Sequence, residues 1–341
     1  RDFLSLESVY NPVISPDGKA ILYSVRKTCW KENKYNLELW VVDHRSGTHH
    51  KLLSGDRSYQ GADWHPDGKS ITYSAPGKNG WQVYRHPLQG EEIVTVTFSE
   101  TGVSSFQWSP NGKTLAFLAV DKKDNHQVKT EQDLGKFEIL DQGFRMSQLW
   151  ILDSKTGKIS KIPGQKNLNV TDLSWSPDGR RIAFTATPDP RPNSFGKSDL
   201  YVFDIHRNRT KPVVVQKGPE QNPVWSPDSQ KIAFTATPGT ESYSATVNIF
   251  TVPLRGGSPV CLTGDFDEDV RIEAWKPAGI FFTACQKMSR HLFRMDTVSK
   301  NITRITRGED FTLDNVTISG DGERMALICK NSQTIKELYL S

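Results

Sequence analysis

The sequence WSPDGRRIAF, at residues 175–184, decides the fold. Its proline sets the φ angle of the first central position of a turn, its aspartate tolerates the second, and its glycine supplies the positive φ that follows. A large apolar residue precedes this turn and a short β-rich run follows it, so the stretch predicts a strand, a tight turn and a second strand.

The same pattern recurs along the whole chain. Close copies are WHPDGKSITY at 64–73, WSPNGKTLAF at 108–117 and WSPDSQKIAF at 225–234. The third position of the turn tetrapeptide falls at 17, 67, 111, 178, 228, 278 and 321, so the intervals are 50, 44, 67, 50, 50 and 43 residues. Seven copies at a period of about 50 are typical of a repeat architecture.

Each hairpin is followed by a third β-rich run, for example residues 200–203, and before the last repeat a fourth run follows, for example residues 303–306. Four antiparallel strands per repeat are typical of a propeller blade. The sequence therefore predicts an all-β, seven-bladed β-propeller that occupies residues 1–341 as a single domain. In the seventh blade the chain stops at Ser341, directly after the third strand. We expect this blade to be incomplete and the natural polypeptide to continue.

Composition excludes several functional classes. Lys and Arg number 43 against 39 Asp and Glu, a net charge of +4, so no nucleic-acid footprint is expected. No apolar run approaches the roughly 18–20 residues that span a bilayer. The four cysteines form no CxxC pair, and His49-His50 beside His44 is better explained as a solvated turn than as a metal site. The repeated tryptophans keep a fixed position before the turn, which predicts packing between blades rather than base stacking.

Catalytic motifs are missing from the sequence. No Gly-x-Ser-x-Gly nucleophile elbow, P-loop or His-Glu-x-x-His motif occurs. We therefore expect no catalytic residue, no metal ligand and no cofactor within residues 1–341.

The interval of 67 residues marks an insertion in the third blade, from about residue 120 to 148. It is long and charged, and such loops in compact folds are usually functional or mobile. It joins the second and third strands, so it should lie on the face opposite the tight turns, where the other connections are long too. Glu138, Asp141 and Arg145 would share one side of a helix and would complement the charged termini of a peptide. The alternative is a solvated charged loop.

The opening of the chain resembles a known family. Leu4-Ser5-Leu6-Glu7, the turn at Asp17, Leu39-Trp40-Val41-Val42-Asp43 and Gly143-Phe144-Arg145 resemble the N-terminal propeller of the prolyl oligopeptidase family. The likeness is greatest to its acylaminoacyl-peptidase and dipeptidyl-peptidase 5 branch. The Trp-Ser-Pro-Asp-Gly signature itself is shared with TolB propellers.

The resemblance implies a C-terminal α/β-hydrolase domain beyond residue 341 that carries a Ser-Asp-His triad. The propeller would then be the non-catalytic part that caps and gates the active site of a serine exopeptidase acting on short peptides. In related dipeptidyl-peptidases a pair of glutamates binds the peptide's N-terminus. Here the adjacent Glu91-Glu92 lies at a turn, which leaves Glu138 and Asp141 as stand-ins.

Two other classes of function stay open. A TolB-like, stand-alone propeller would bind a protein partner. A lyase or glycan-acting propeller would need converging side chains on the inner strands, which offer mainly Asp63, Asp172 and Glu273. The exposed strand edge of the last blade would also permit a homodimer. The resemblance implies an exported, periplasmic protein, with a cytoplasmic location as the alternative.

Overall fold

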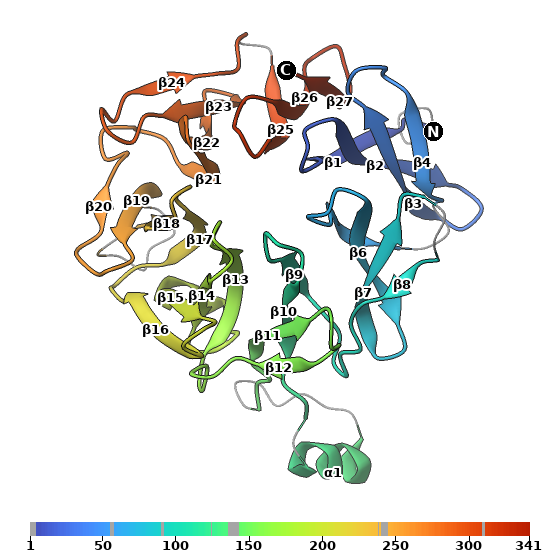
Figure 1. The fold of residues 1–341 in the computed structure, drawn as a ribbon, viewed down its shortest axis with the longest axis vertical. Coiled ribbons are helices and arrows are strands. Elements are labelled where there is room, and N and C mark those ends of the chain that lie inside the picture. The colour runs from blue at the N-terminus through green and yellow to red at the C-terminus, as the bar shows by residue number, and fades with distance from the viewer. Residues whose placement is uncertain are drawn as a thin grey trace.

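Seven β-sheets stand around a common centre in chain order, as the computed structural model shows (Figure 1). The structure describes residues 5–54, 58–89, 92–123, 125–135, 143–237, 239, 245–308 and 311–341. Six sheets have four antiparallel strands and the last has three. The predicted seven-bladed propeller with an incomplete last blade is therefore confirmed.

Within each blade the strands follow one another from the inside of the ring to the outside. Blades one to three contain β1 (Ser8–Ile14), β2 (Ala20–Cys29), β3 (Lys34–Asp43) and β4 (His49–Leu53); β5 (Gln60–Trp64), β6 (Ser70–Gly77), β7 (Gly80–Pro87) and β8 (Val94–Thr95); and β9 (Ser105–Trp108), β10 (Thr114–Val120), β11 (Ser147–Asp153) and β12 (Ile159–Lys161). Blades four and five contain β13 (Asn169–Trp175), β14 (Arg181–Thr187), β15 (Asp199–Asp204) and β16 (Arg209–Val214); and β17 (Glu220–Trp225), β18 (Lys231–Ala236), β19 (Asn248–Pro253) and β20 (Val260–Cys261). Blades six and seven contain β21 (Val270–Lys276), β22 (Gly279–Gln286), β23 (Ser289–Met295) and β24 (Ile302–Arg304); and β25 (Thr312–Ile318), β26 (Met325–Lys330) and β27 (Glu337–Leu340). Two helices, α1 (Asn125–Leu134) and the 3-10 helix η2 (Pro192–Lys197), lie in connections between strands.

The repeated tetrapeptide forms the turn between the first two strands of a blade, and its side chains close that turn. In blade four the Ser176 hydroxyl donates a hydrogen bond to Asp178 Oδ1 at 2.6 Å and accepts one from the Arg181 amide at 2.9 Å. Gly179 has a φ of +66°, which an L side chain rarely adopts. The motif thus fixes the hairpin locally, before any contact between blades is made.

The repeated tryptophans join neighbouring blades. Trp175 Nε1 donates a hydrogen bond to the Gln107 carbonyl of the preceding blade at 3.0 Å, and Trp225 Nε1 donates one to the Ser174 carbonyl at 3.0 Å. Trp64 makes the equivalent bond to blade one. The acceptor in each case is the residue just before the last position of the preceding inner strand. The predicted packing role of these tryptophans is confirmed.

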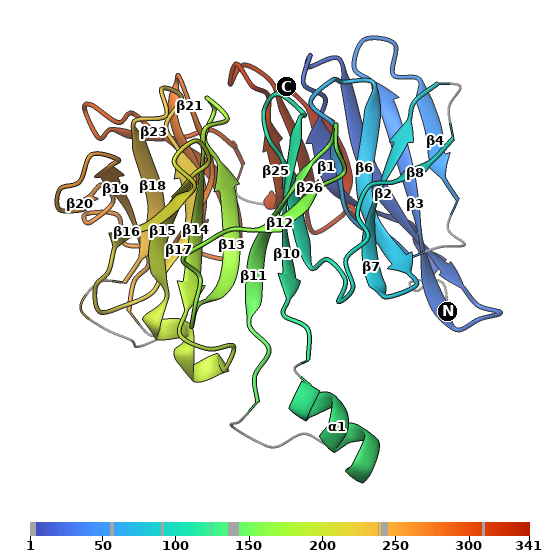
Figure 2. The ribbon, with the colours of Figure 1, turned by 60° about the horizontal axis from the view of Figure 1, so that its bottom comes forward.

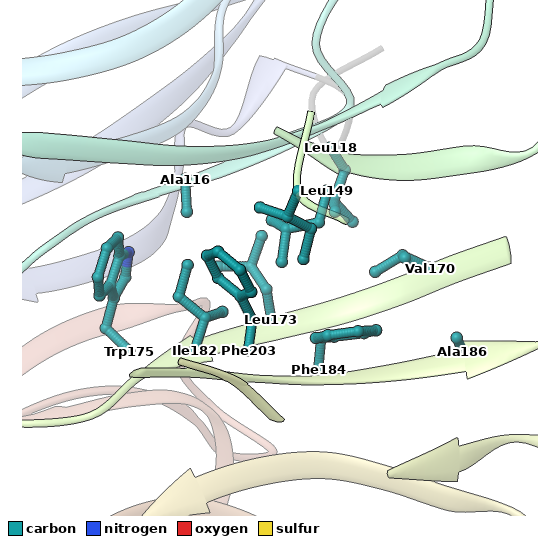
Figure 3. Packing of buried hydrophobic residues seen from close by; sticks show 11 residues of the cluster. Ala116, Leu118, Leu149, Val170, Leu173, Trp175, Ile182, Phe184, Ala186 and Phe203 are labelled. Carbon is teal, nitrogen blue, oxygen red and sulfur yellow. The ribbon is translucent and has the colours of Figure 1, made fainter. Parts of the chain in front are cut away.

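The core lies between the faces of adjacent blades. Between blades three and four the side chains point toward one another from both sheets (Figure 3). Phe184, Ile182 and Leu149 are fully buried there, and each such side chain contributes about 1.5–3 kcal/mol through burial. An apolar cluster of the same kind lies between the other neighbouring blades. The ring is therefore held together by packing between the faces of its blades.

The first and last blades meet without sharing a sheet. No strand of blade seven pairs with β1 within the part of the chain that the structure describes. The contact consists of an apolar cluster that includes Ile21 and Ala326, together with a hydrogen bond of 2.6 Å from Arg324 Nη1 to the Gly18 carbonyl. Side-chain packing therefore closes the ring.

The two faces of the ring differ. The tight turns lie on one face, while α1 and the short helix η2, drawn in yellow-green, project from the other (Figure 2). We call the second one the insertion face and define it by the connections between second and third strands: residues 30–33, 78–79, 121–146, 188–198, 237–247, 287–288 and 331–336. The connections at 30–33, 78–79 and 287–288 are short, so the expectation that the other connections on this face are long too is wrong for these three.

Candidate functional site

The insertion of blade three forms a projecting arm. Helix α1 stands away from the ring (Figures 1 and 2), and Gln127 Nε2 ties it to the Gly143 carbonyl at 3.0 Å. An ion pair between Lys123 and Glu131 also fastens the helix to the chain that enters it. These two contacts join parts of the insertion to each other.

The predicted site residues lie in or after this arm. Glu138 and Asp141 fall outside the described residues, so their proposed role stays a prediction. Arg145 is exposed and lies in a non-helical segment directly before β11. The described helix of this insertion ends at Leu134, eleven positions before Arg145.

The arm touches the insertion of blade four. The Arg191 guanidinium lies over the Phe144 ring, 5.7 Å from its centroid. Asp189 holds that guanidinium in a fork, with Nε–Oδ1 at 3.0 Å and Nη2–Oδ2 at 2.7 Å, and also accepts a hydrogen bond from the Ser194 hydroxyl at 2.6 Å. The hydrogen bonds from Arg191 and Ser194 hold the pKa of Asp189 well below its usual value. The two insertions therefore brace each other.

Large apolar side chains are exposed on the insertion face. Met288 is 94% exposed, Leu134 73% and Trp30 50%. Other exposed apolar side chains of these connections are Val128, Phe144 and Ile335. Single exposed apolar residues are ordinary, and others, such as Phe98 at 75% and Val298 at 92%, are exposed outside these connections.

Carboxyl groups on the inner strands form a second feature. Burial raises the pKa of Asp63 to about 6, and it also raises the pKa values of Asp172 and Glu273. Asp63 and Asp172 each accept a hydrogen bond from the next backbone amide, and Glu273 accepts one from the Thr283 hydroxyl at 2.8 Å. These contacts orient the carboxyl groups without neutralising them.

The inner strands do not assemble a metal site. Among the described residues, no three His, Cys, Asp or Glu side chains are placed to share a metal ion. In the same part of the chain, no helix has the length and apolar character needed to cross a bilayer.

Sequence reasoning missed two features, one in the blade-four insertion and one at the start of β17. The Asp189–Arg191–Ser194 cluster had a signal, namely a turn-forming stretch that is rich in proline between two strands. The buried Glu220 had none, because a glutamate that starts a strand looks like any surface residue.

This chain is similar to propellers of known proteins in sequence and in fold. A family model described as the TolB beta propeller domain (PD40) matches residues 6–148. Dipeptidyl-peptidase 5 of Porphyromonas gingivalis is 24% identical to this chain over 92% of this chain and 50% of its own length. The chain thus spans about half the length of that curated relative.

Two solved structures share the fold. Acylaminoacyl peptidase of Pyrococcus horikoshii superposes with a TM-score of 0.77 at 16% identity, over 100% of this chain and 52% of its own. The propeller domain of the Trilobed protease of Pyrococcus furiosus superposes with a TM-score of 0.72 at 15% identity, over 98% and 92% of the two chains. The expected likeness to propellers of this peptidase group is confirmed.

Proposed function

We propose that this chain, a PD40-type propeller similar to those of dipeptidyl and acylaminoacyl peptidases, is the non-catalytic domain of such an exopeptidase. In this role it covers the active site of a linked α/β-hydrolase domain and admits short peptides. The chain itself contributes packing, access control and contacts to substrate.

One observation carries this proposal. Nearly the whole chain aligns with only about half of a dipeptidyl peptidase, and all of it superposes on about half of an acylaminoacyl peptidase. A propeller that is used as one part of a longer peptidase accounts for both numbers.

The insertion face is the surface we assign to the hydrolase domain. It presents exposed apolar side chains, including Met288 and Leu134, which lose contact with water when a second domain packs on them. It also carries two insertions that brace each other through Arg191 and Phe144. A rigid and partly apolar surface suits a stable contact between domains.

Enclosure of the active site by the propeller would control which substrates reach it. A chamber closed by a ring of sheets excludes folded proteins by size and keeps bulk water from the acyl-enzyme chemistry. Glu138, Asp141 and Arg145 lie in or after the arm of blade three, and we assign them contacts to the charged termini of the peptide.

Kinetics of the natural polypeptide that contains residues 1–341 tests this proposal. We expect hydrolysis of chromogenic dipeptide or acyl-amino-acid substrates and no cleavage of a folded protein. The pair Glu138→Gln and Asp141→Asn, and separately Arg145→Ala, should raise KM more than they lower kcat. Arg207→Ala is the matched control, because Arg207 is an exposed arginine in the β15–β16 turn.

Two results would contradict this reading. Absence of peptidase activity in that polypeptide would favour the TolB-like alternative, a module that binds a protein partner. Unchanged KM values in all the arm variants would leave the peptidase assignment intact and remove the assigned substrate contacts.

A further inference from the structure

Arg26, near the end of β2, lies between two aromatic rings of its own blade. Its guanidinium carbon is 5.0 Å from the centroid of the Tyr10 ring on β1 and 4.5 Å from the centroid of the Tyr35 ring on β3. The strand register explains this arrangement, because the two tyrosines pair with the residues two positions before and after Arg26. The three side chains therefore share one face of blade one, beside the connection 30–33 of the insertion face.

The guanidinium of Arg26 has no acidic partner among the described residues, and no hydrogen bond links its side chain to another of them. The acids of the same strands are already engaged by lysines. Glu7 pairs with Lys27 at 2.9 Å. Glu38 pairs with Lys27 at 3.2 Å and with Lys51 at 2.8 Å. A guanidinium carries five N–H donors in its plane, and stacking on rings occupies its faces rather than this edge. The donor edge of Arg26 is therefore available to a ligand.

Blade seven adds one cation and one acid to this place. The Lys336 ammonium lies 4.0 Å from the centroid of the same Tyr10 ring and is paired at 2.7 Å with Asp314 of β25. Blades one and seven adjoin in both views of the ring (Figures 1 and 2). The lysine and the aspartate balance each other, so the single positive charge of Arg26 stays uncompensated. Because Asp314 repels a dianion more than a monoanion, this place suits a group with one negative charge.

We propose that Arg26 binds the carboxylate of a short peptide on the insertion face. A carboxylate accepts two parallel hydrogen bonds from one guanidinium, and stacking against Tyr10 and Tyr35 holds the guanidinium plane ready for them. Tyr35 is 52% exposed, and Trp30 of the adjoining connection is 50% exposed. Both rings are thus open to an apolar side chain next to that carboxylate. The choice of a peptide as the carrier of the carboxylate rests on the proposed function, whereas the charge and geometry of the arginine do not.

Nuclear magnetic resonance of the full 341-residue chain, labelled with nitrogen-15, tests this site. The probes are N-acetyl-glycyl-alanine, which ends in a free carboxylate, its C-terminal amide, and inorganic phosphate, all at pH 7.5 and at equal ionic strength because salt screens exposed charges. We expect the peptide acid to move the Arg26 Nε–H resonance in a saturable way. The amide should bind at least about tenfold more weakly, since it lacks the charge that the guanidinium recognises. Phosphate should also bind more weakly than the peptide acid.

Two variants separate ligand binding from a purely structural role of Arg26. Arg26→Lys keeps the charge but loses the pair of parallel donors, so it should weaken binding of the peptide acid about tenfold, as measured at the backbone amides of residues 24–28. Arg207→Ala is the matched control, because Arg207 is an exposed arginine in the β15–β16 turn, and it should leave that affinity unchanged. Circular dichroism shows whether each variant is folded. An arginine that only braces the strands would show no shift of its Nε–H resonance with any probe.

Four outcomes would overturn the inference. The first is an Arg26 Nε–H resonance that no probe moves. The second is equal affinity for the peptide acid and its amide, which would mean that the carboxylate is not recognised. The third is unchanged affinity in Arg26→Lys, and the fourth is tighter binding of phosphate than of the peptide acid. Absence of peptidase activity in the natural polypeptide that contains residues 1–341 would remove the proposed function without changing this binding, so the two failures can be told apart.

Discussion

The tryptophan that recurs in each blade allows the contribution of one hydrogen bond to be measured against an internal control. Trp175 and Trp225 each donate a bond of 3.0 Å to a carbonyl of the preceding blade. Trp108 is as deeply buried, at 8% exposed, but its Nε1 has no hydrogen-bond partner in the described residues. The His65 ring packs edge-on against Trp108, with centroids 4.6 Å apart.

Replacing each tryptophan by phenylalanine removes the same atoms but not the same interactions. In Trp175→Phe and Trp225→Phe a bond worth about 0.5–1.5 kcal/mol is lost and a carbonyl is left without its partner. In Trp108→Phe a buried donor that had no partner disappears, which offsets part of the loss of packing. We expect the first two variants to lose about 1–3 kcal/mol more free energy of unfolding than the third.

Urea unfolding followed by circular dichroism is the suitable assay. For a chain of 341 residues, 1 kcal/mol moves the melting temperature by only about 1.4 °C, whereas the urea midpoint responds in proportion to the free energy. If Trp108→Phe proves as destabilising as Trp175→Phe and Trp225→Phe, then ring packing rather than the interblade hydrogen bond holds the blades together.

Two further predictions concern a buried charge and a close backbone contact. Glu38 accepts hydrogen bonds from two lysines and a tryptophan, and these hold its pKa below the usual value against the opposing effect of burial. Glu38→Gln should therefore lose about 1–2 kcal/mol at pH 7, and less as the pH falls through the lowered pKa of Glu38 and the wild-type carboxyl takes up its proton; a loss that does not change with pH in urea titrations would refute this. Gly279 has a φ of +130°, and a Cβ there would lie 2.2 Å from the Met295 carbonyl oxygen, so Gly279→Ala should cost more than about 3 kcal/mol or prevent folding. In Gly68→Ala, where φ is +68° and nothing lies within 4 Å of the added Cβ, we expect a loss of only about 1–2 kcal/mol in the free energy of unfolding. If thermal melts show comparable losses for the two variants, backbone strain alone, without the contact to Met295, explains both.

The blades were predictable from the sequence because each hairpin is specified by residues that lie close together in the chain. The turn around Asp178 closes through contacts within six residues, from Ser176 to Arg181, so a single copy of the motif specifies its own hairpin. The period then fixes the number of blades. Even the degraded copy at 276–279 forms its turn, because β21 and β22 pair through Lys276 and Gly279.

The site was less predictable because its contacts are not local. The contact between Phe144 and Arg191 joins two insertions that are 47 positions apart in the sequence. The Glu220 backbone is hydrogen-bonded to Ser198, which belongs to another blade. Nothing in the residues around Glu220 signals its burial, since that burial arises only when blades four and five pack together.

This division between local and non-local contacts bears on where function resides in the ring. In the β1–β2, β13–β14 and β17–β18 connections, the serine and aspartate side chains of the tetrapeptide are already used to close the turn, so little remains there for binding. On the insertion face, the connections range from two residues at 287–288 to 26 residues at 121–146 and are braced by contacts between blades. Length and sequence can change there without disturbing the hairpins. Binding is therefore expected on the insertion face, where the assigned domain contact lies.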